Sequence, residues 1–363
     1  MYRSHKVSVI LPCRNEGDHL AEVVKRIPKC IDEIIVVSNR SIDNTVAVAK
    51  KLGVKVYEDD RAINGIGYGY AHMTGIKHAT GNIIVGIDGD ATYPIEDIQK
   101  IIDSMLKRKL DFLSCNRYPV RKGTYIPWKL QLGVQVLNAE TFFLYGKRVK
   151  DILSGMWVFK ADIKDSLNLT MGDWNLSPQI KINAFTNPRI RAGEYSIAQH
   201  TRRGETKQNH FETGMSHLVW IASNRFGFSS PNNQYVMRFL IIGSVAFVLN
   251  ALTLLVCADV FHIEKITAEI IAMVFSLNFT FYLHDNWTYV IHDDRSTGYK
   301  KPFLVRYTEY IISNIIGAGM TVGVFWLLSG LMPKLAALAI GALVAMIWNF
   351  IMNKIVIWKH TAE

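Results

Sequence analysis

Two carboxylates separated by one small residue follow an apolar run, in the segment Ile87-Asp88-Gly89-Asp90. Asp88 and Asp90 offer the hard oxygen ligands that Mg²⁺ or Mn²⁺ prefers, alongside diphosphate oxygens. A cation held there would neutralise charge on a departing nucleoside diphosphate. An ordinary acidic turn can have the same two residues by chance. The position of the pair at the end of a predicted buried strand is what favours a functional site. We therefore predict a divalent-cation site at Asp88 and Asp90.

The elements that would position this pair alternate between strand and helix. Short apolar runs, typical of buried strands, alternate with segments of helical periodicity over the first ninety residues. This alternation of strands and helices predicts a parallel, doubly wound sheet with helices on both faces. The expected strands are Val7–Leu11, Ile34–Val37, Val54–Tyr57 and Ile83–Ile87, and the expected helices are Leu20–Ile27, Thr45–Leu52 and Tyr70–Lys77.

Polar residues gather where the expected strands end, which is where ligands bind in such sheets. Arg14, Asn15 and Glu16 follow the first strand, and residues 38–41 (Ser-Asn-Arg-Ser) follow the second. The segment Asn64–Gly69 holds three glycines. Glycines let a loop lie close to a ligand, although a plain flexible loop has the same composition. We expect one ligand site along this edge of the sheet.

Four apolar runs fill the last third of the chain, at about 236–257, 266–283, 310–332 and 335–357. Each has roughly the 20 residues that cross a bilayer, and four in succession make a soluble helical domain the weaker alternative. The positive-inside rule then sets the orientation. Both termini, the first domain and the loop after the second run are expected to be cytoplasmic, because that loop and the C-terminal end carry more basic residues than the other two loops. The middle loop and the C-terminal end carry Arg295, Lys300, Lys301, Arg306, Lys354 and Lys359, whereas the other two loops carry only Lys265 and Lys334. The early apolar stretch is too short for a signal peptide, which agrees with that expectation.

The apolar region contains an internal repeat. Asn278-Phe279 precedes Trp287 by the same number of residues as Asn349-Phe350 precedes Trp358. This predicts an all-α membrane domain over residues 231–363, built from two hairpins of two helices. The two asparagines are expected to cap or bridge helices, since amides inside a membrane find partners, with lipid binding as the alternative.

Charge and cysteines narrow the function classes. The net charge is +10, and no zinc spacing or RNA-binding signature supports nucleic acid as a partner. With membrane segments in the chain, phosphates and anionic lipid are the expected partners. The four cysteines form no CxxC pair, so we interpret them as reduced thiols.

Two segments of the first domain look amphipathic, Pro127–Tyr145 and His210–Phe228. Each mixes apolar and aromatic residues with basic or amide ones. Ordinary core helices and helices lying in the membrane interface both have this pattern, and the sequence leaves the two open.

Further segments give the first 230 residues a family resemblance. Asn116-Arg117-Tyr118, the D-x-x-S-G segment 151–155 and the R-x-G-x-[ST]-K segment 202–207 follow the DxD pair in order. With it, they make residues 6–227 resemble glycosyltransferase family 2, in its dolichol-phosphate mannose synthase-like branch. The repeat region resembles the GtrA-like membrane domain, which carries the N-F…W pattern twice.

The resemblance implies a GT-A (Rossmann-like) α/β domain over residues 1–230. It also implies inverting, Mg²⁺- or Mn²⁺-dependent transfer of a hexose from a nucleotide-sugar to a polyprenyl or dolichyl phosphate. That acceptor is already an oxyanion near neutral pH, since its second pKa is about 6, so no general base is required. Arginine binds phosphate in bidentate fashion. The expected acceptor-phosphate residues are Arg117, Arg202, Lys207 and the weaker candidate Lys129.

The same resemblance yields the remaining site residues, with solvated surface charges as the alternative for each cation. The catalytic set is Asp88, Asp90, Arg117 and Arg202. The nucleotide-sugar set is Pro12, Arg14, Asn15, Glu16, Ser38, Asn39, Asp43, Gly67, Asp88, Gly89 and Asp90.

Three departures from the family pattern leave the donor open. Ser38-Asn39 stand where an acidic pair is usual, Thr92-Tyr93 where Gln-His is common, and Ile66 where Lys is frequent. GDP-mannose is the first candidate donor, and UDP-glucose or UDP-GlcNAc are alternatives. A processive polysaccharide synthase is disfavoured because the chain lacks a Q-x-x-R-W motif. A non-enzymatic carrier or scaffold for lipid-linked sugars is the alternative to an enzyme, and a homo-oligomer is left open.

Overall fold

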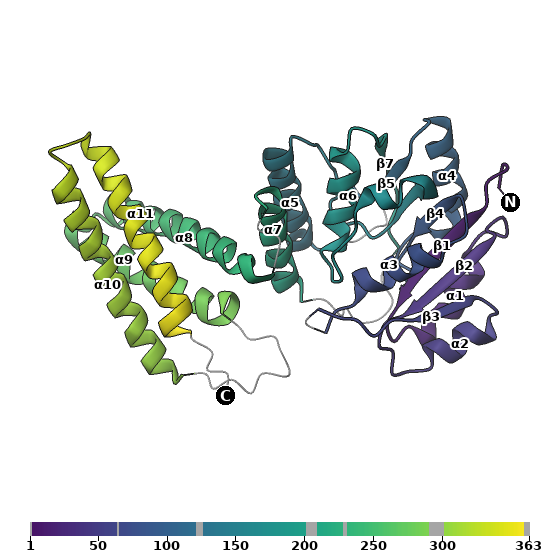
Figure 1. The fold of residues 1–363 in the computed structure, drawn as a ribbon, viewed down its shortest axis with the longest axis horizontal. Helices are drawn as coiled ribbons and strands as arrows, with labels where there is room; N and C mark the ends of the chain where they lie inside the picture. The colour runs from purple at the N-terminus through teal and green to yellow at the C-terminus, as the bar shows by residue number, and fades with distance from the viewer. Residues whose placement is uncertain are drawn as a thin grey trace. The chain divides into compact units, whose positions relative to one another are not determined.

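The computed structural model describes residues 2–63, 65–120, 126–200, 209–227, 231–289 and 301–358. The chain divides into two compact units, Met1–Gly227 and Phe228–Glu363. Figure 1 shows the first as a sheet between helices and the second as a set of helices.

The first unit is built on a seven-stranded sheet in the order β3-β2-β1-β4-β6-β5-β7. Its strands are β1 (Val7–Cys13), β2 (Glu33–Ser38), β3 (Lys55–Glu58), β4 (Ile83–Gly86), β5 (Phe112–Asn116), β6 (Trp157–Lys160) and β7 (Ala192–Ser196). Its helices are α1 (Gly17–Arg26), α2 (Thr45–Lys51), α3 (Tyr68–His78), α4 (Ile98–Lys107), α5 (Trp128–Tyr145), α6 (Leu176–Thr186) and α7 (His210–Arg225).

The sheet is mixed, which corrects the expectation of a purely parallel one. Strands β3, β2, β1 and β4 are parallel as predicted, but β6 runs antiparallel to both β4 and β5. The segment that forms β6 is a short apolar run, and such a run does not reveal the direction in which a strand will pair. The elements from β1 to β4 otherwise lie within a few residues of their predicted bounds.

Helices cover both faces of the sheet because strand side chains alternate in direction. In β1, Val9 and Leu11 pack in one apolar cluster with residues of α1, α2 and α4. The intervening Ile10 packs in a second cluster with Ile76 of α3 and Ile180 of α6. The edge of the sheet at the carboxyl ends of the parallel strands is thereby left for loops.

The two amphipathic segments form α5 and α7, and the structure gives each of them a core side and an exposed apolar side. Leu137 of α5 packs with Trp220 and Ile221 of α7 in a third cluster. On other sides of these helices, large apolar side chains are exposed to solvent: Trp128, Leu132, Val136, Phe142, Phe143 and Phe211.

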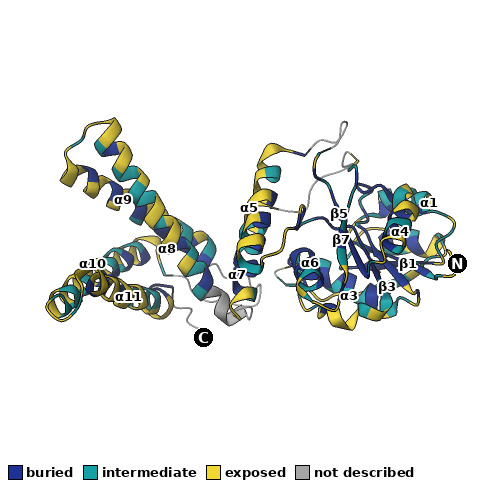
Figure 2. Cartoon of the chain, turned by 90° about the horizontal axis from the view of Figure 1, so that it is seen from above, coloured by how far each residue is buried: buried dark blue, intermediate teal, exposed yellow. Residues whose placement is uncertain are grey.

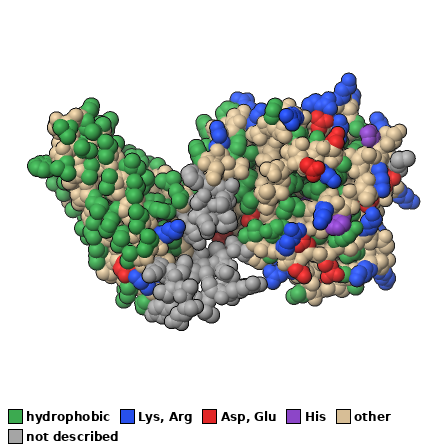
Figure 3. Space-filling model, in the orientation of Figure 1, with side chains coloured by type: hydrophobic (Ala, Val, Ile, Leu, Met, Phe, Trp, Pro, Cys, Tyr) green, Lys and Arg blue, Asp and Glu red, His purple; other side chains and the backbone are tan. Residues whose placement is uncertain are grey.

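The second unit consists of α8 (Pro231–Leu255), α9 (Lys265–Leu283), α10 (Phe303–Leu328) and α11 (Lys334–Met352), with short π-helical turns after α8, α9 and α11. Four helical segments are long and apolar enough to cross a membrane, at Val236–Val260, Lys265–Thr288, Phe303–Leu328 and Lys334–Ile357. Helix α8 packs on α9, and α10 packs on α11. Figure 2 shows many exposed residues along these helices, and Figure 3 shows that hydrophobic side chains cover most of the visible face of this unit.

The repeated asparagines bridge helices, as predicted. Asn278 of α9 accepts a hydrogen bond from the Tyr307 hydroxyl of α10, at 2.9 Å. Asn349 of α11 accepts one from the Ser313 hydroxyl of α10 and donates one to Asn314 Oδ1. Each amide thus ties the second helix of a hairpin to α10.

A buried ion pair lies at one end of the same helices. Arg306 donates to both carboxylate oxygens of Asp285 at 2.8 Å, and the Trp358 indole N–H donates to Asp285 Oδ1 at 2.9 Å. Two of the basic residues that predicted the orientation are therefore engaged with acids, since Lys301 also pairs with Glu309.

Candidate active site

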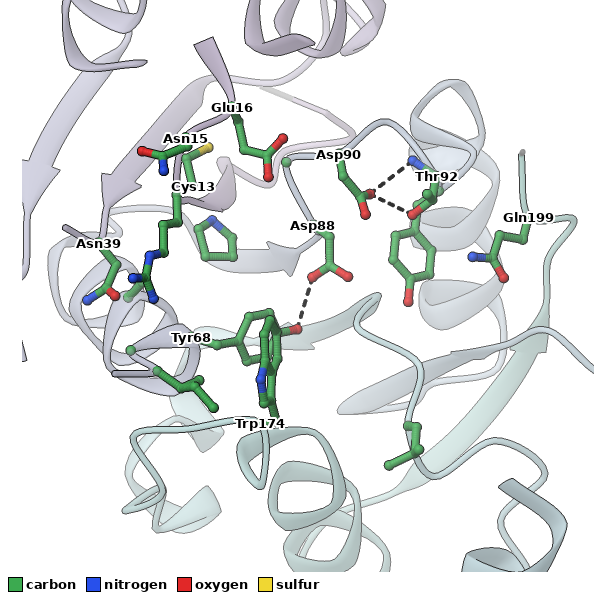
Figure 4. Close-up of a pocket in the computed structure, with 18 of the residues that line it drawn as sticks. Cys13, Asn15, Glu16, Asn39, Tyr68, Asp88, Asp90, Thr92, Trp174 and Gln199 are labelled. Atoms are coloured by element: carbon green, nitrogen blue, oxygen red, sulfur yellow. Dashed lines mark hydrogen bonds between the residues drawn. The ribbon is translucent and has the colours of Figure 1, made fainter. Parts of the chain in front are cut away.

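A cavity of about 470 Å³ opens at the carboxyl ends of β1, β2 and β4. Figure 4 shows Asp88 and Asp90 near its centre, with Glu16 on one side and Thr92 on the other; Asp88 points toward Tyr68 and Asp90 toward Thr92. The predicted residues that line it are Pro12, Arg14, Asn15, Glu16, Asn39, Gly67, Asp88, Gly89, Asp90 and Arg117. The strand ends thus bring together residues that lie up to a hundred positions apart.

The other five predicted residues are not among the described residues that line the cavity. Ser38 is buried in the last position of β2 and Asp43 accepts hydrogen bonds from the Gly17 and Thr45 amides, so neither lines the cavity. Lys129 is exposed in the first turn of α5, with its ammonium over the Trp128 ring. Arg202 and Lys207 lie outside the described residues.

The local backbone explains how the two carboxylates are presented. Ala91 has φ +61°, a left-handed conformation that turns the chain directly after Asp90. The Thr92 amide and hydroxyl then both donate to Asp90 Oδ1, at 3.1 and 2.6 Å. The orientation of Asp90 is thereby set by its own turn.

Asp88 is oriented by Tyr68, which was not among the predicted site residues. The Tyr68 hydroxyl donates to Asp88 Oδ1 at 2.9 Å (Figure 4). Burial, together with the nearby charge of Asp88, raises the pKa of Tyr68 well above its usual value, so the phenol keeps its proton and remains a donor. The Tyr68 ring in turn lies against Trp174, with ring centroids 4.6 Å apart.

Close backbone approach shapes two sides of the cavity. A side chain on Gly155 would meet the Asp88 carboxylate at 2.6 Å, so the Asp88 group lies directly on the backbone at Gly155. A side chain on Gly67 would meet the Asn39 amide at 2.1 Å. Both positions therefore require glycine.

Arg117 lines the cavity and forms an ion pair with Asp151. Its Nε donates to Asp151 Oδ2 at 2.6 Å and its Nη2 donates to Asp151 Oδ1 at 2.9 Å. Burial tends to raise the pKa of Asp151, but the Arg117 charge and hydrogen bonds hold it below its usual value. The pair is therefore ionised across the physiological pH range.

The donor set at the centre of the cavity fits a divalent cation. Within the described residues, no cluster of three or more His, Cys, Asp or Glu side chains could hold a metal. Mg²⁺, however, usually keeps several waters and is bound by one or two carboxylates together with substrate phosphates. Asp88 and Asp90 supply two carboxylates at a cavity with room for such a substrate. They would hold the cation, and the remaining ligands would come from diphosphate and water.

Several residues that line the cavity were not among the predicted site residues. They are Cys13, Ile66, Tyr68, Ala71, Thr92, Tyr93, Leu153, Trp174 and Gln199. Tyr68 lies within the glycine segment Asn64–Gly69 and Tyr93 follows Asp90 by three residues, so their positions in the chain could have suggested them. Trp174 and Gln199 reach the cavity only through the fold.

Comparison with protein families decides the class of this site. Residues 8–167 match the model of glycosyl transferase family 2, and residues 238–358 match that of the GtrA/DPMS transmembrane domain. This chain carries a family 2 glycosyltransferase domain in its first unit. Its second unit, with four candidate membrane helices and the GtrA/DPMS match, makes the glycosyltransferase a membrane protein.

Two curated relatives are similar over nearly the whole glycosyltransferase. A low-salt glycan biosynthesis hexosyltransferase, Agl6, of Haloferax volcanii is 26% identical over 94% of this chain and 80% of its own length. A dolichol-phosphate mannosyltransferase of Pyrococcus furiosus is 26% identical over 97% of this chain and 99% of its own.

The solved structure of glucosyl-3-phosphoglycerate synthase from Mycobacterium tuberculosis, with Mn²⁺, UDP-glucose and phosphoglyceric acid, resembles the first unit. It has a TM-score of 0.51 and 18% identity, and the match covers 63% of this chain and 82% of that one. At this identity the likeness concerns the fold alone, and it supports a GT-A-like fold for the first unit.

Proposed function

We propose that this glycosyltransferase moves a hexose, with inversion, from a nucleotide-sugar to a polyprenyl or dolichyl phosphate. The observation that carries the proposal is the pair Asp88 and Asp90, which lines one cavity with Arg14 and Arg117 in a chain that also has four candidate membrane helices. The carboxylates suit a cation-bound diphosphate, and the arginines suit phosphate oxygens. The names of the two full-length relatives support a hexose and a lipid phosphate.

The chemistry needs positioning more than proton transfer. An oxygen of the acceptor phosphate forms a bond to the anomeric carbon while the bond from that carbon to the nucleoside diphosphate breaks. The leaving diphosphate takes the electron pair, and no proton has to be removed, because a phosphate monoester is already ionised near neutral pH. Mg²⁺ or Mn²⁺, when bound, supplies charge neutralisation for the leaving group.

The chain's own residues have separate roles in this scheme. Asp88, fixed by Tyr68, and Asp90, fixed by Thr92, present carboxylates for the cation and its diphosphate. Arg117, fixed by Asp151, presents a cation to the acceptor phosphate. Such preorganised charges cost no reorganisation at the moment of transfer. Arg202 and Lys207 are proposed to complete the acceptor site, and Lys129, which is exposed on α5, stays the weaker candidate.

The membrane placement follows from the same proposal. The exposed aromatic residues Trp128, Phe143 and Phe211 suit the boundary between lipid and water, and a lipid phosphate acceptor would be met there. We propose that the first unit and both termini face the cytoplasm, as the basic loops indicate. Labelling of single cysteines placed in the 295–300 loop with a membrane-impermeant thiol reagent, from either side of sealed vesicles, tests this orientation.

The decisive experiment measures nucleoside diphosphate release by the full chain in detergent with Mg²⁺ or Mn²⁺. GDP-mannose, UDP-glucose and UDP-GlcNAc are each supplied with and without polyprenyl phosphate. Release that needs one donor and the lipid phosphate supports the proposal and names the sugar. Folded protein that releases nothing with any pair would favour a carrier or scaffold instead.

A matched pair of variants separates the cation site from general charge effects. Asp90→Asn should reduce lipid-dependent release at least about 100-fold, since it weakens transition-state charge stabilisation by several kcal/mol. Asp97→Asn removes an acid of the same unit that bonds to Lys100 at the surface, and should leave the rate unchanged. Equal rates in the two variants would contradict the role of Asp90.

A further inference from the structure

One lysine of the first unit is completely buried. Lys181 lies on α6 with 0% of its surface exposed. Its ammonium donates to the carbonyl oxygens of Ile152 at 2.8 Å and Ser154 at 2.5 Å. A buried charge of this kind is costly, and it is normally paired with an acid. Within the described residues, no acid lies within salt-bridge distance of the Lys181 ammonium. Its hydrogen bonds go to backbone instead.

The backbone that Lys181 holds is the segment 151–155, here called the wall segment. Its first residue, Asp151, binds the guanidinium of Arg117. Its last residue, Gly155, donates its amide hydrogen to the Tyr93 hydroxyl at 2.6 Å and lies directly against the Asp88 carboxylate. Three side chains that line the cavity, those of Arg117, Tyr93 and Asp88, therefore contact this segment of five residues.

Lys181 bonds the middle of this segment, between those two ends. Ile152 and Ser154 flank Leu153, which itself lines the cavity. Asn138 of α5 supports the same stretch by accepting a hydrogen bond from the Ile152 amide at 3.0 Å. If the ammonium were removed, the carbonyl oxygens of Ile152 and Ser154 would be buried without a hydrogen-bond donor. This is energetically costly, so the segment is expected to move until the two oxygens find other donors.

Some of the charges around Lys181, those of Asp88 and Arg117, belong to groups that line the cavity. Burial lowers its pKa to about 7, Asp151, Glu194 and Asp88 act to raise it, and Arg117 acts to lower it. The Lys181 charge therefore interacts electrostatically with both members of the pair Asp151 and Arg117, which the wall segment holds in place.

We propose that Lys181 is a positioning residue for the transfer reaction, which holds the wall segment so that Arg117 and Asp88 keep the places in which they meet the reacting phosphates. The inference rests on the proposed function, because it assigns those two groups to phosphate and cation. Lys181 itself does not line the cavity and touches no substrate.

The chain offers a closely matched control on the same helix. Asn183 is two residues further along α6, and its amide also donates to two backbone carbonyls, of Leu167 at 2.7 Å and Asn168 at 3.3 Å. Those carbonyls belong to a segment that does not line the cavity. Lys181→Met and Asn183→Ala therefore remove the same kind of support at two different places.

The experiment compares these variants in the full chain by steady-state kinetics and by hydrogen exchange read by mass spectrometry. Lys181→Met should lower kcat about 10- to 100-fold with a donor KM within about threefold of the parent, because a misplacement near 1 Å is that costly to transfer. Hydrogen exchange should rise at least about tenfold in residues 151–156. Asn183→Ala should leave kcat unchanged and raise exchange near residues 167–168 instead. Lys181→Gln, which keeps N–H donors, should fall between parent and Lys181→Met, and it serves as the test if Lys181→Met does not fold.

Unchanged exchange in the wall segment of Lys181→Met or Lys181→Gln overturns the inference, whether or not transfer is detected. An equal fall of kcat in the Lys181 and Asn183 variants also overturns it, since the effect would then follow stability alone. Absence of lipid-dependent transfer by the parent chain overturns the proposed function separately.

Discussion

The guanidinium of Arg117 and the carboxylate of Asp151 meet side by side, with Nε–Oδ2 and Nη2–Oδ1 distances of 2.6 and 2.9 Å. The acid is 0% exposed and the arginine 15% exposed. A paired fork of this kind fixes direction as well as distance. The cation that we assign to the acceptor phosphate is therefore aimed by an anion that no solvent reaches.

Removing the acid of this pair should damage both folding and transfer. Asp151→Asn leaves a buried guanidinium without its counter-charge, which typically costs about 3–5 kcal/mol. We expect a lower thermal unfolding midpoint and at least a tenfold slower transfer. The double variant Arg117→Gln/Asp151→Asn should regain stability and stay inactive. A double variant that recovers transfer would show that Arg117 is needed only for structure.

The Tyr68 hydroxyl should matter to the cation more than to the fold. Tyr68→Phe keeps the ring that contacts Trp174 and removes the hydrogen bond to Asp88. Partners of metal ligands commonly change metal affinity or activity about 10- to 100-fold. We expect the Mn²⁺ concentration for half-maximal transfer to rise within that range. Tyr145→Phe removes a tyrosine hydroxyl bonded to Ile221 and Asn224, away from the cavity, and should leave the Mn²⁺ response unchanged.

Acid should destabilise the first unit through Glu33. Burial raises the pKa of this carboxyl, but hydrogen bonds from Lys55, Ser8 and Thr80 outweigh it and lower the pKa from 4.5 to about 2. The native state thus holds the charged form more tightly than the unfolded state does. The stabilisation is complete above pH 4.5 and is lost as the pH falls toward 2.

Glu33→Gln should therefore be less stable than the parent at pH 7, by about 2–3 kcal/mol, with a difference that shrinks toward pH 2. Unfolding followed by intrinsic fluorescence at a series of pH values measures this. Glu58→Gln, at an exposed acid in β3, should reproduce the parent curve. A constant difference between Glu33→Gln and the parent at all pH values would contradict the assignment.

The ion pair in the second unit should be needed for stability as a pair. Asp285→Asn leaves Arg306 buried without its acid, so the detergent-solubilised protein should unfold at a lower temperature. Asp285→Asn/Arg306→Gln should recover most of the loss. Glu309→Gln, in a pair whose side chains are each about 30% exposed, should have a much smaller effect. Failure of the double variant to recover would mean that the two charges act independently.

The sequence was sufficient for the elements whose signals are local. The four parallel strands and the loops after them were predicted, because buried strands are apolar runs and the DxD pair directly follows one of them. The nucleotide-sugar prediction included both Ser38 and Asn39, yet only Asn39 lines the cavity. Successive side chains of an extended chain point to opposite faces, so one neighbour of such a pair turns away.

The parts that were missed depend on contacts between distant segments. The antiparallel direction of β6 follows from its pairing with β4 and β5, and nothing in the four residues of β6 encodes it. Trp174 and Gln199 reach the cavity from around α6 and β7, more than 150 residues beyond the loop that follows β1. Neither Trp174 nor Gln199 belongs to a sequence motif whose spacing would indicate that it lines a cavity.

The late position of these two wall residues has a consequence for how the protein is made. The family 2 match ends at residue 167, whereas the cavity also uses Trp174 and Gln199. The first membrane helix, α8, begins only at Pro231. Domains generally fold as units in the order of their synthesis. Every described residue of the cavity is therefore synthesised before the first residue of α8, so the pocket can take shape on a nascent chain whose first membrane helix is not yet complete.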